Sequence, residues 1–122
     1  MKTNAIFLFL ILFAITVCAN AQLAGKKFKI TTEQNGTFYL LFEKNTYELI
    51  ISMGDAAVKG TYKIEGKTIS FIDKEGEMAC PEENVGKYKF SLKNKVFKME
   101  LIEDSCTGRP NMAASPWELV EK

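Results

Sequence analysis

The chain has 122 residues, 16 basic and 15 acidic side chains and a formal net charge of +1, which suits one small domain with one core. Its lysines alternate with acids, so it lacks the basic stripe that nucleic acid requires, and no nucleic-acid partner is expected. It contains no histidine, which excludes Ser–His and Cys–His catalysis and histidine metal sites.

Residues 1–21 are predicted to be a secretory signal peptide and not part of the fold. A positive start and an apolar run over residues 5–17 precede the small residues of Ala19-Asn20-Ala21, which suit a cleavage site. The run is too short to span a membrane, so no transmembrane segment is expected. A bacterial lipoprotein signal with a lipid on Cys18 is the alternative. We therefore expect a secreted or periplasmic domain of residues 22–122.

The mature chain predicts eight β-strands in which apolar residues alternate with polar ones. The expected strands are residues 27–32, 37–43, 46–53, 58–65, 68–72, 87–92, 96–102 and 116–120. The side chains expected to point inward are Phe28, Ile30, Phe38, Leu40, Phe42, Tyr47, Leu49, Ile51, Tyr62, Ile64, Ile69, Phe71, Tyr88, Phe90, Leu92, Phe97, Met99, Leu101, Trp117 and Leu119. Residues 107–115 are compatible with one short turn of helix.

Three expected hairpins share one spacing, which predicts how the strands are connected. The apolar pairs Phe42/Tyr47, Ile64/Ile69 and Leu92/Phe97 each lie five residues apart, as a two-residue loop requires when one face of each strand is buried. The longer connections then gather at the opposite end. The sequence therefore predicts an all-β, eight-stranded antiparallel up-and-down barrel with a floor and a mouth, closed by pairing of the last strand with the first.

The cysteines predict one disulfide. Signal cleavage removes Cys18 and leaves Cys80 and Cys106, which flank the 86–102 hairpin in an oxidising compartment. A catalytic or metal-binding pair is the alternative, but the chain has no histidine and no C-x-x-C spacing. We expect no metal and no cofactor.

The second half of the chain carries motifs in a family-like order. These are Gly-x-Tyr-x-Ile at 60–64, Ile69-Ser70-Phe71, Cys80-Pro81, Gly-x-Tyr-x-Phe at 86–90, Asp104-Ser105-Cys106 followed by Arg109, and Pro116-Trp117. In this order they resemble the small bacterial lipocalin-like proteins. The resemblance implies a lipocalin-like barrel of eight strands, a secreted or lipid-anchored form and, in some members, an apolar ligand in the lumen.

The barrel interior leaves two interpretations open. An eight-stranded barrel is just wide enough to be filled by side chains or to hold one small ligand. A packed core is one expectation. The other is a narrow cavity near the mouth, whose expected lining is Tyr62, Tyr88, Phe97, Met99 and Trp117.

Arg109 is the only arginine, and it lies in a mouth loop just after Cys106. Its planar guanidinium could tie the loop to a carboxylate or to carbonyls, or stack on Trp117. Alternatively, it could bind the acid head of a fatty acid or a similar anion, which makes it a tentative ligand-binding residue.

Several acids lie in the expected mouth loops and are interpreted as solvated side chains. They are Glu75, Glu77, Glu82, Glu83, Glu103 and Asp104. Paired carboxylates can hydrolyse glycosides or bind calcium, but a small closed barrel offers no cleft for sugar and the spacing matches no calcium loop. We therefore expect no enzyme.

The combined prediction is a secreted small barrel that binds an apolar or amphipathic small ligand. The alternative is a non-enzymatic interaction or inhibitor module that has a packed core and binds another protein through its mouth loops.

Overall fold

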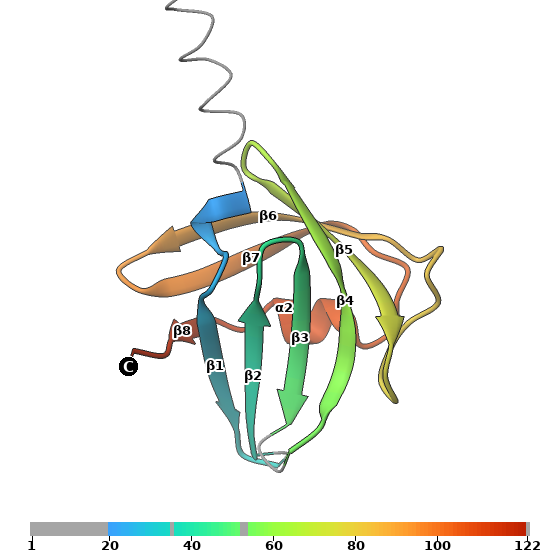
Figure 1. Ribbon diagram of the computed structural model, residues 1–122, viewed down its shortest axis with the longest axis horizontal. Coiled ribbons are helices and arrows are strands. Elements are labelled where there is room, and N and C mark those ends of the chain that lie inside the picture. Colours follow the sequence, from blue (N-terminus) through green and yellow to red (C-terminus); the bar gives the residue numbers. More distant parts are fainter. Residues whose placement is uncertain (1–19, 35, 52–53, 122) are drawn as a thin grey trace, which may run out of the picture.

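Eight antiparallel strands form one closed barrel in the computed structural model, which describes residues 20–34, 36–51 and 54–121 (Figure 1). The strands pair in chain order and are β1 (Lys27–Thr32), β2 (Gly36–Phe42), β3 (Thr46–Ile51), β4 (Ala56–Glu65), β5 (Thr68–Glu75), β6 (Gly86–Lys93), β7 (Val96–Glu103) and β8 (Trp117–Leu119). A 3-10 turn η1 (Asn20–Gln22) precedes β1, and a short helix α2 (Arg109–Ala113) precedes β8. Most of the expected signal peptide, residues 1–19, lies outside the described residues.

The three predicted hairpin registers are confirmed. Phe42 pairs with Tyr47, Ile64 with Ile69, and Leu92 with Phe97. The β6–β7 turn has positive φ at both central residues, 53° at Asn94 and 66° at Lys95, which is the type I′ geometry that matches the twist of a hairpin. Local turn chemistry and strand alternation therefore agree on one register.

The tight turns at 43–45, 66–67 and 94–95 lie at one end of the barrel, which we call the closed end. The η1 turn lies beside it, at the top of Figure 1, where Gly25 N–H donates a hydrogen bond of 2.8 Å to the Phe42 carbonyl. Leu23 is fully buried there. The opposite end, the mouth, carries the connections 76–85 and 104–116.

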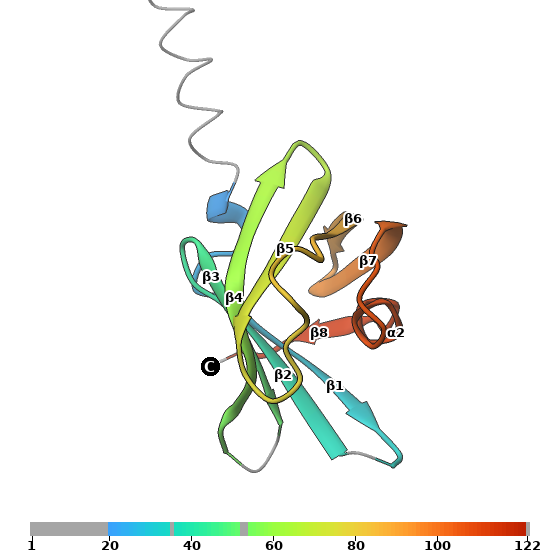
Figure 2. The same ribbon diagram turned by 90° about the vertical axis from the view of Figure 1, so that its right-hand side faces the viewer.

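β8 closes the barrel through a short pairing. It pairs with β1 at Phe28↔Leu119 and with β7 at Phe97↔Trp117. Each of these two pairings contains only one further residue pair among the described residues. The chain between β7 and β8 carries α2, which packs against β7, and Figure 2 shows α2 beside these two strands. The predicted pairing of the last strand with the first is confirmed.

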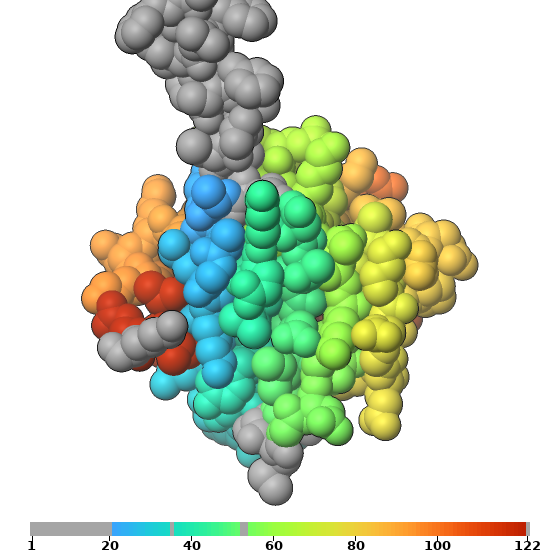
Figure 3. Space-filling model, viewed as in Figure 1, coloured from blue at the N-terminus to red at the C-terminus, as the bar shows by residue number. Residues whose placement is uncertain are grey.

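Aromatic side chains fill the part of the barrel around Phe42. The ring centroids of Phe28 and Phe97 are 5.2 Å apart, and Phe42 meets Phe97 at 5.7 Å and Tyr62 at 4.9 Å. The space-filling view shows β1 to β5 side by side as one wall around this core (Figure 3). Edge-to-face and stacked pairs of this kind add to the free energy gained from apolar burial.

Two sequence expectations about the strands need correction. Leu101 was expected to point inward, but it is 53% exposed, and its neighbour Ile102 is 56% exposed. A register shift between Lys87 and Tyr88 of β6 lies opposite these residues, so the regular alternation of β7 ends there. The other correction is β5, which continues to Glu75 and not only to residue 72, and thereby places Asp73 inside.

Candidate functional site

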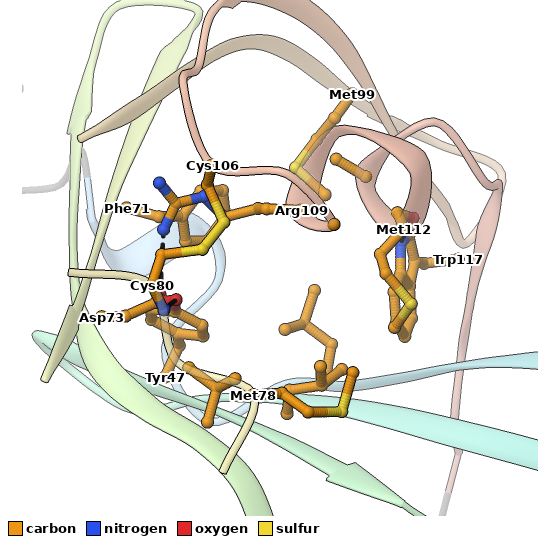
Figure 4. Close-up of a pocket in the computed structure, with 15 residues that line it drawn as sticks. Tyr47, Phe71, Asp73, Met78, Cys80, Met99, Cys106, Arg109, Met112 and Trp117 are labelled. Carbon is orange, nitrogen blue, oxygen red and sulfur yellow. Dashed lines mark hydrogen bonds and ion pairs between the residues drawn. A yellow bond between two sulfur atoms is a disulfide. The ribbon is translucent and has the colours of Figure 1, made fainter. Parts of the chain in front are cut away.

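A cavity of about 120 Å³ opens at the mouth, between the barrel wall and α2 (Figure 4). Its lining is mainly apolar and consists of Leu40, Tyr47, Leu49, Val58, Phe71, Asp73, Met78, Cys80, Met99, Cys106, Gly108, Arg109, Met112, Ala113 and Trp117. The aromatic core thus fills the barrel toward the closed end and leaves a hollow toward the mouth.

α2 forms the wall opposite the barrel strands. Pro110 lies in its first turn, where a proline costs no helical hydrogen bond. Trp117 Nε1 donates to the Met112 carbonyl at 3.2 Å, which fixes the indole against the helix. Met78, Met99 and Met112 surround the hollow in Figure 4, and methionine adapts its shape to what it contacts.

One end of the cavity is a buried polar cluster, made of Tyr47, Asp73, Tyr88, Asp104 and Arg109. Arg109 Nε and Nη2 donate to the two carboxylate oxygens of Asp104 at 2.7 and 2.9 Å, and Nη1 lies 3.0 Å from Asp73 Oδ1. The Tyr47 hydroxyl donates to Asp73, and the Tyr88 hydroxyl donates to Asp104. The Arg109 side chain is 11% exposed and that of Asp104 is fully buried.

The predicted disulfide is present and is attached to this cluster. The Cα atoms of Cys80 and Cys106 are 5.9 Å apart. Cys80 N–H donates to Asp73 Oδ2 and Cys106 N–H to Asp104 Oδ1, both at 2.9 Å. Arg109 also donates to the Asn84 carbonyl. Both mouth connections therefore converge on the same buried charges.

Glycines make room for the cluster. Gly60 pairs with Tyr47 on one side and with Asp73 on the other, so the Tyr47 side chain can cross the bare backbone to reach Asp73. A β-carbon on Gly60 would lie 2.9 Å from the Tyr47 ring. One on Gly86 would lie 2.5 Å from Asp104 Oδ2. The glycines that open the two Gly-x-Tyr motifs thus have a steric role here.

Hydrogen bonding sets the ionisation of the cluster. Burial raises the pKa of Asp104, but hydrogen bonds from Arg109 and Tyr88 outweigh burial and hold this pKa below its usual 3.8. Burial, then the hydrogen bonds to Asp73 and Asp104, raise the pKa of Tyr47 and of Tyr88. Burial lowers the pKa of Arg109, but the two aspartates raise it by more than burial lowers it. The guanidinium therefore stays charged.

The buried Tyr62 predicts a loss of stability in alkali. Burial, and then Glu43, raise the pKa of Tyr62 from 10.0 to about 12. Its contribution is fully present below pH 10 and is lost between pH 10 and pH 12, because the unfolded tyrosine ionises first. From pH 8 to pH 11, urea unfolding should show that Tyr62→Phe loses about 1 kcal/mol less stability than the wild type. Tyr39→Phe is the control, and an equal loss in Tyr62→Phe and wild type would contradict the prediction.

Three of the six predicted ligand-binding residues line the cavity: Met99, Arg109 and Trp117. The other three lie elsewhere. Phe97 belongs to the aromatic core, Tyr88 to the polar cluster, and the Tyr62 hydroxyl donates to the Glu43 carbonyl beside a closed-end turn. The contacts of Arg109 match the first of its two interpretations, in which it ties the mouth loop to carboxylates and a carbonyl.

Sequence reasoning missed the carboxylates of the cluster. Asp104 was expected to be a solvated loop acid, and this is wrong, because its side chain is buried against Arg109. Glu77, Glu82 and Glu83 are exposed, as expected. Asp73 could have been found, since it continues the inward alternation of Ile69 and Phe71.

Asp73 and the two cysteines beside the polar cluster bring together three atoms of types that bind metals. A carboxylate oxygen of Asp73 and the sulfurs of Cys80 and Cys106 all lie within 4.8 Å of one another. The two sulfurs are joined as a disulfide, so they offer no thiolates to an ion.

No family model, curated protein or solved structure matches this chain. Within residues 20–34, 36–51 and 54–121, no helix is long and apolar enough to cross a membrane.

Proposed function

We propose that this protein is a secreted binding barrel that holds one small apolar ligand, or one apolar group of a larger ligand, in the mouth cavity. The observation that carries the proposal is a mainly apolar hollow of about 120 Å³ with a few polar groups at one end. A pocket of this composition is the usual form of a small-molecule site. We propose that the protein acts by binding and not by catalysis.

The size of the hollow limits the ligand. Apolar cavities of about 150 Å³ bind benzene or xenon and stay free of water. A single ring, a branched chain end or a short aliphatic chain therefore suits this cavity, and a complete long-chain lipid does not. The resemblance to lipocalin-like proteins, some of which hold an apolar ligand in the lumen, supports the same proposal.

A second candidate is the interaction module. Met78 is 48% exposed at the rim of the cavity, so an apolar side chain of a protein partner could enter the same hollow. In that case the mouth loops would provide the surrounding contacts.

The proposal predicts that filling the cavity abolishes ligand binding. Ala113 is buried in the cavity wall at the end of α2, and the next residue, Ala114, is exposed. We expect toluene to shift the methyl resonances of Met99 and Met112 in the wild type and in Ala114→Leu. We expect at least ten-fold weaker binding by Ala113→Leu.

Leu49→Phe fills the same cavity from the barrel wall and is the second variant where Ala113→Leu fails to fold. Circular dichroism verifies the fold of each variant. Equal toluene binding by wild type and the filled variants, or no binding by the wild type, would contradict the proposed function.

A further inference from the structure

We infer that the mouth cavity selects an uncharged ligand and rejects carboxylates. This inference rests on the proposed function, because it concerns the ligand of the same cavity. An arginine at a cavity wall ordinarily suggests an anionic ligand. Here the contacts of that arginine lead to the opposite conclusion.

The positive charge of Arg109 is already paired with two carboxylates. Among the described residues that line the cavity, only Asp73 and Arg109 are charged. The guanidinium forms ion pairs with Asp73 at 3.0 Å and with Asp104 at 2.7 Å. One cation thus faces two carboxylates, and the formal charge of the cluster is −1.

A ligand carboxylate would be the third acid beside one guanidinium. It would lose its hydration on entering an apolar hollow, and like charges would repel it there. Both penalties act on the anion and neither acts on an uncharged ligand of the same shape.

A ligand cation is also disfavoured. Asp73 Oδ1 already accepts the Tyr47 hydroxyl and faces Arg109, while Oδ2 accepts Cys80 N–H. An ammonium group has three donors and needs an acceptor for each of them when it is buried. The rest of the lining is mainly methionine, aliphatic and aromatic side chains, which cannot supply these acceptors.

Arg109 Nη1 does not offer a donor to a ligand. This nitrogen has almost no accessible surface, and it lies 3.0 Å from Asp73 Oδ1. The other guanidinium nitrogens donate to Asp104. An uncharged ligand therefore gains no charge partner here, but it avoids the penalties that act on an anion or a cation.

Benzamide and benzoate test the inference, because they have nearly the same shape and differ in charge. Toluene is the purely apolar reference. We expect the full mature chain, titrated at pH 7 by NMR, to bind benzamide at least ten-fold more tightly than benzoate, and to bind toluene as well. Equal or tighter binding of benzoate would overturn the inference and leave the proposed function standing. Binding of toluene without benzamide would overturn the inference, because the cavity would then also reject an uncharged polar ligand, and failure of all three ligands would overturn the proposed function itself.

Charge variants distinguish this cluster from the overall charge of the protein. Asp104→Asn brings the cluster to zero without changing a residue that lines the cavity. We expect Asp104→Asn to reduce the ratio of benzamide affinity to benzoate affinity at least three-fold. Glu65→Gln makes the same charge change on an exposed residue beside a closed-end turn and should leave the ratio unchanged. An unchanged ratio in Asp104→Asn would overturn the electrostatic explanation, and if that variant fails to fold, Asp73→Asn makes the same charge change.

Discussion

Replacing Arg109 with methionine is expected to destabilise the protein by about 3 to 5 kcal/mol, because it leaves buried carboxylates without their cation. Asp73 and Asp104 are 3% and 0% exposed at their side chains, so water cannot replace the guanidinium. Arg109→Lys should also destabilise the protein, since one ammonium cannot reproduce the paired hydrogen bonds to Asp104.

Urea unfolding of each variant measures this effect. Lys63→Met removes a cation from an exposed ion pair with Glu65 and should cost less than about 1 kcal/mol. Adding Asp73→Asn and Asp104→Asn to Arg109→Met should restore part of the lost stability, because no uncompensated charge then remains. A loss below about 1 kcal/mol in Arg109→Met would show that the buried ion pairs do not stabilise the fold.

Loss of the disulfide is expected to have a similar effect. Cys80 and Cys106 are 26 residues apart in the sequence. Opening a loop of that length should lower the free energy of unfolding by about 3 to 4 kcal/mol, because the unfolded chain gains conformational entropy. The native state also loses order, because both cysteine amides donate to carboxylates of the polar cluster.

The double variant Cys80→Ser/Cys106→Ser and the reduced wild type should therefore lose similar stability in urea. Hydrogen exchange should become faster at the amides of residues 80 and 106, which lie on the two mouth connections. The hairpin β4–β5 lies outside the disulfide loop, and its closed-end turn should exchange as before. If reduction leaves the unfolding midpoint unchanged, the disulfide does not hold the mouth connections together.

The barrel could be predicted because its determinants are local. Alternation with a period of two assigns a strand face, and a two-residue turn then sets the register, as at Ile64↔Ile69. The cysteine count predicted the disulfide, and residues 107–115 were compatible with the short helix, which is α2 in the structure. Strand alternation was wrong at Leu101, where a register shift interrupts it.

The candidate site could be predicted only in part. Met99 and Trp117 follow from strand alternation, and the structure places both at the cavity. Met78 and Met112 lie on connections whose sequence carries no periodic signal. Their position depends on how these connections fold over the mouth.

The sequence by itself determined the strand faces, the hairpin registers and the cysteine pair, because each depends on neighbours in the chain or on a count of residues. Only the tertiary structure decided that Asp73 and Asp104 share one arginine. Those three residues come from β5 and from the connection after β7, and no spacing rule links them. Burial of the charges makes their pairing necessary, and burial is a property of the closed barrel.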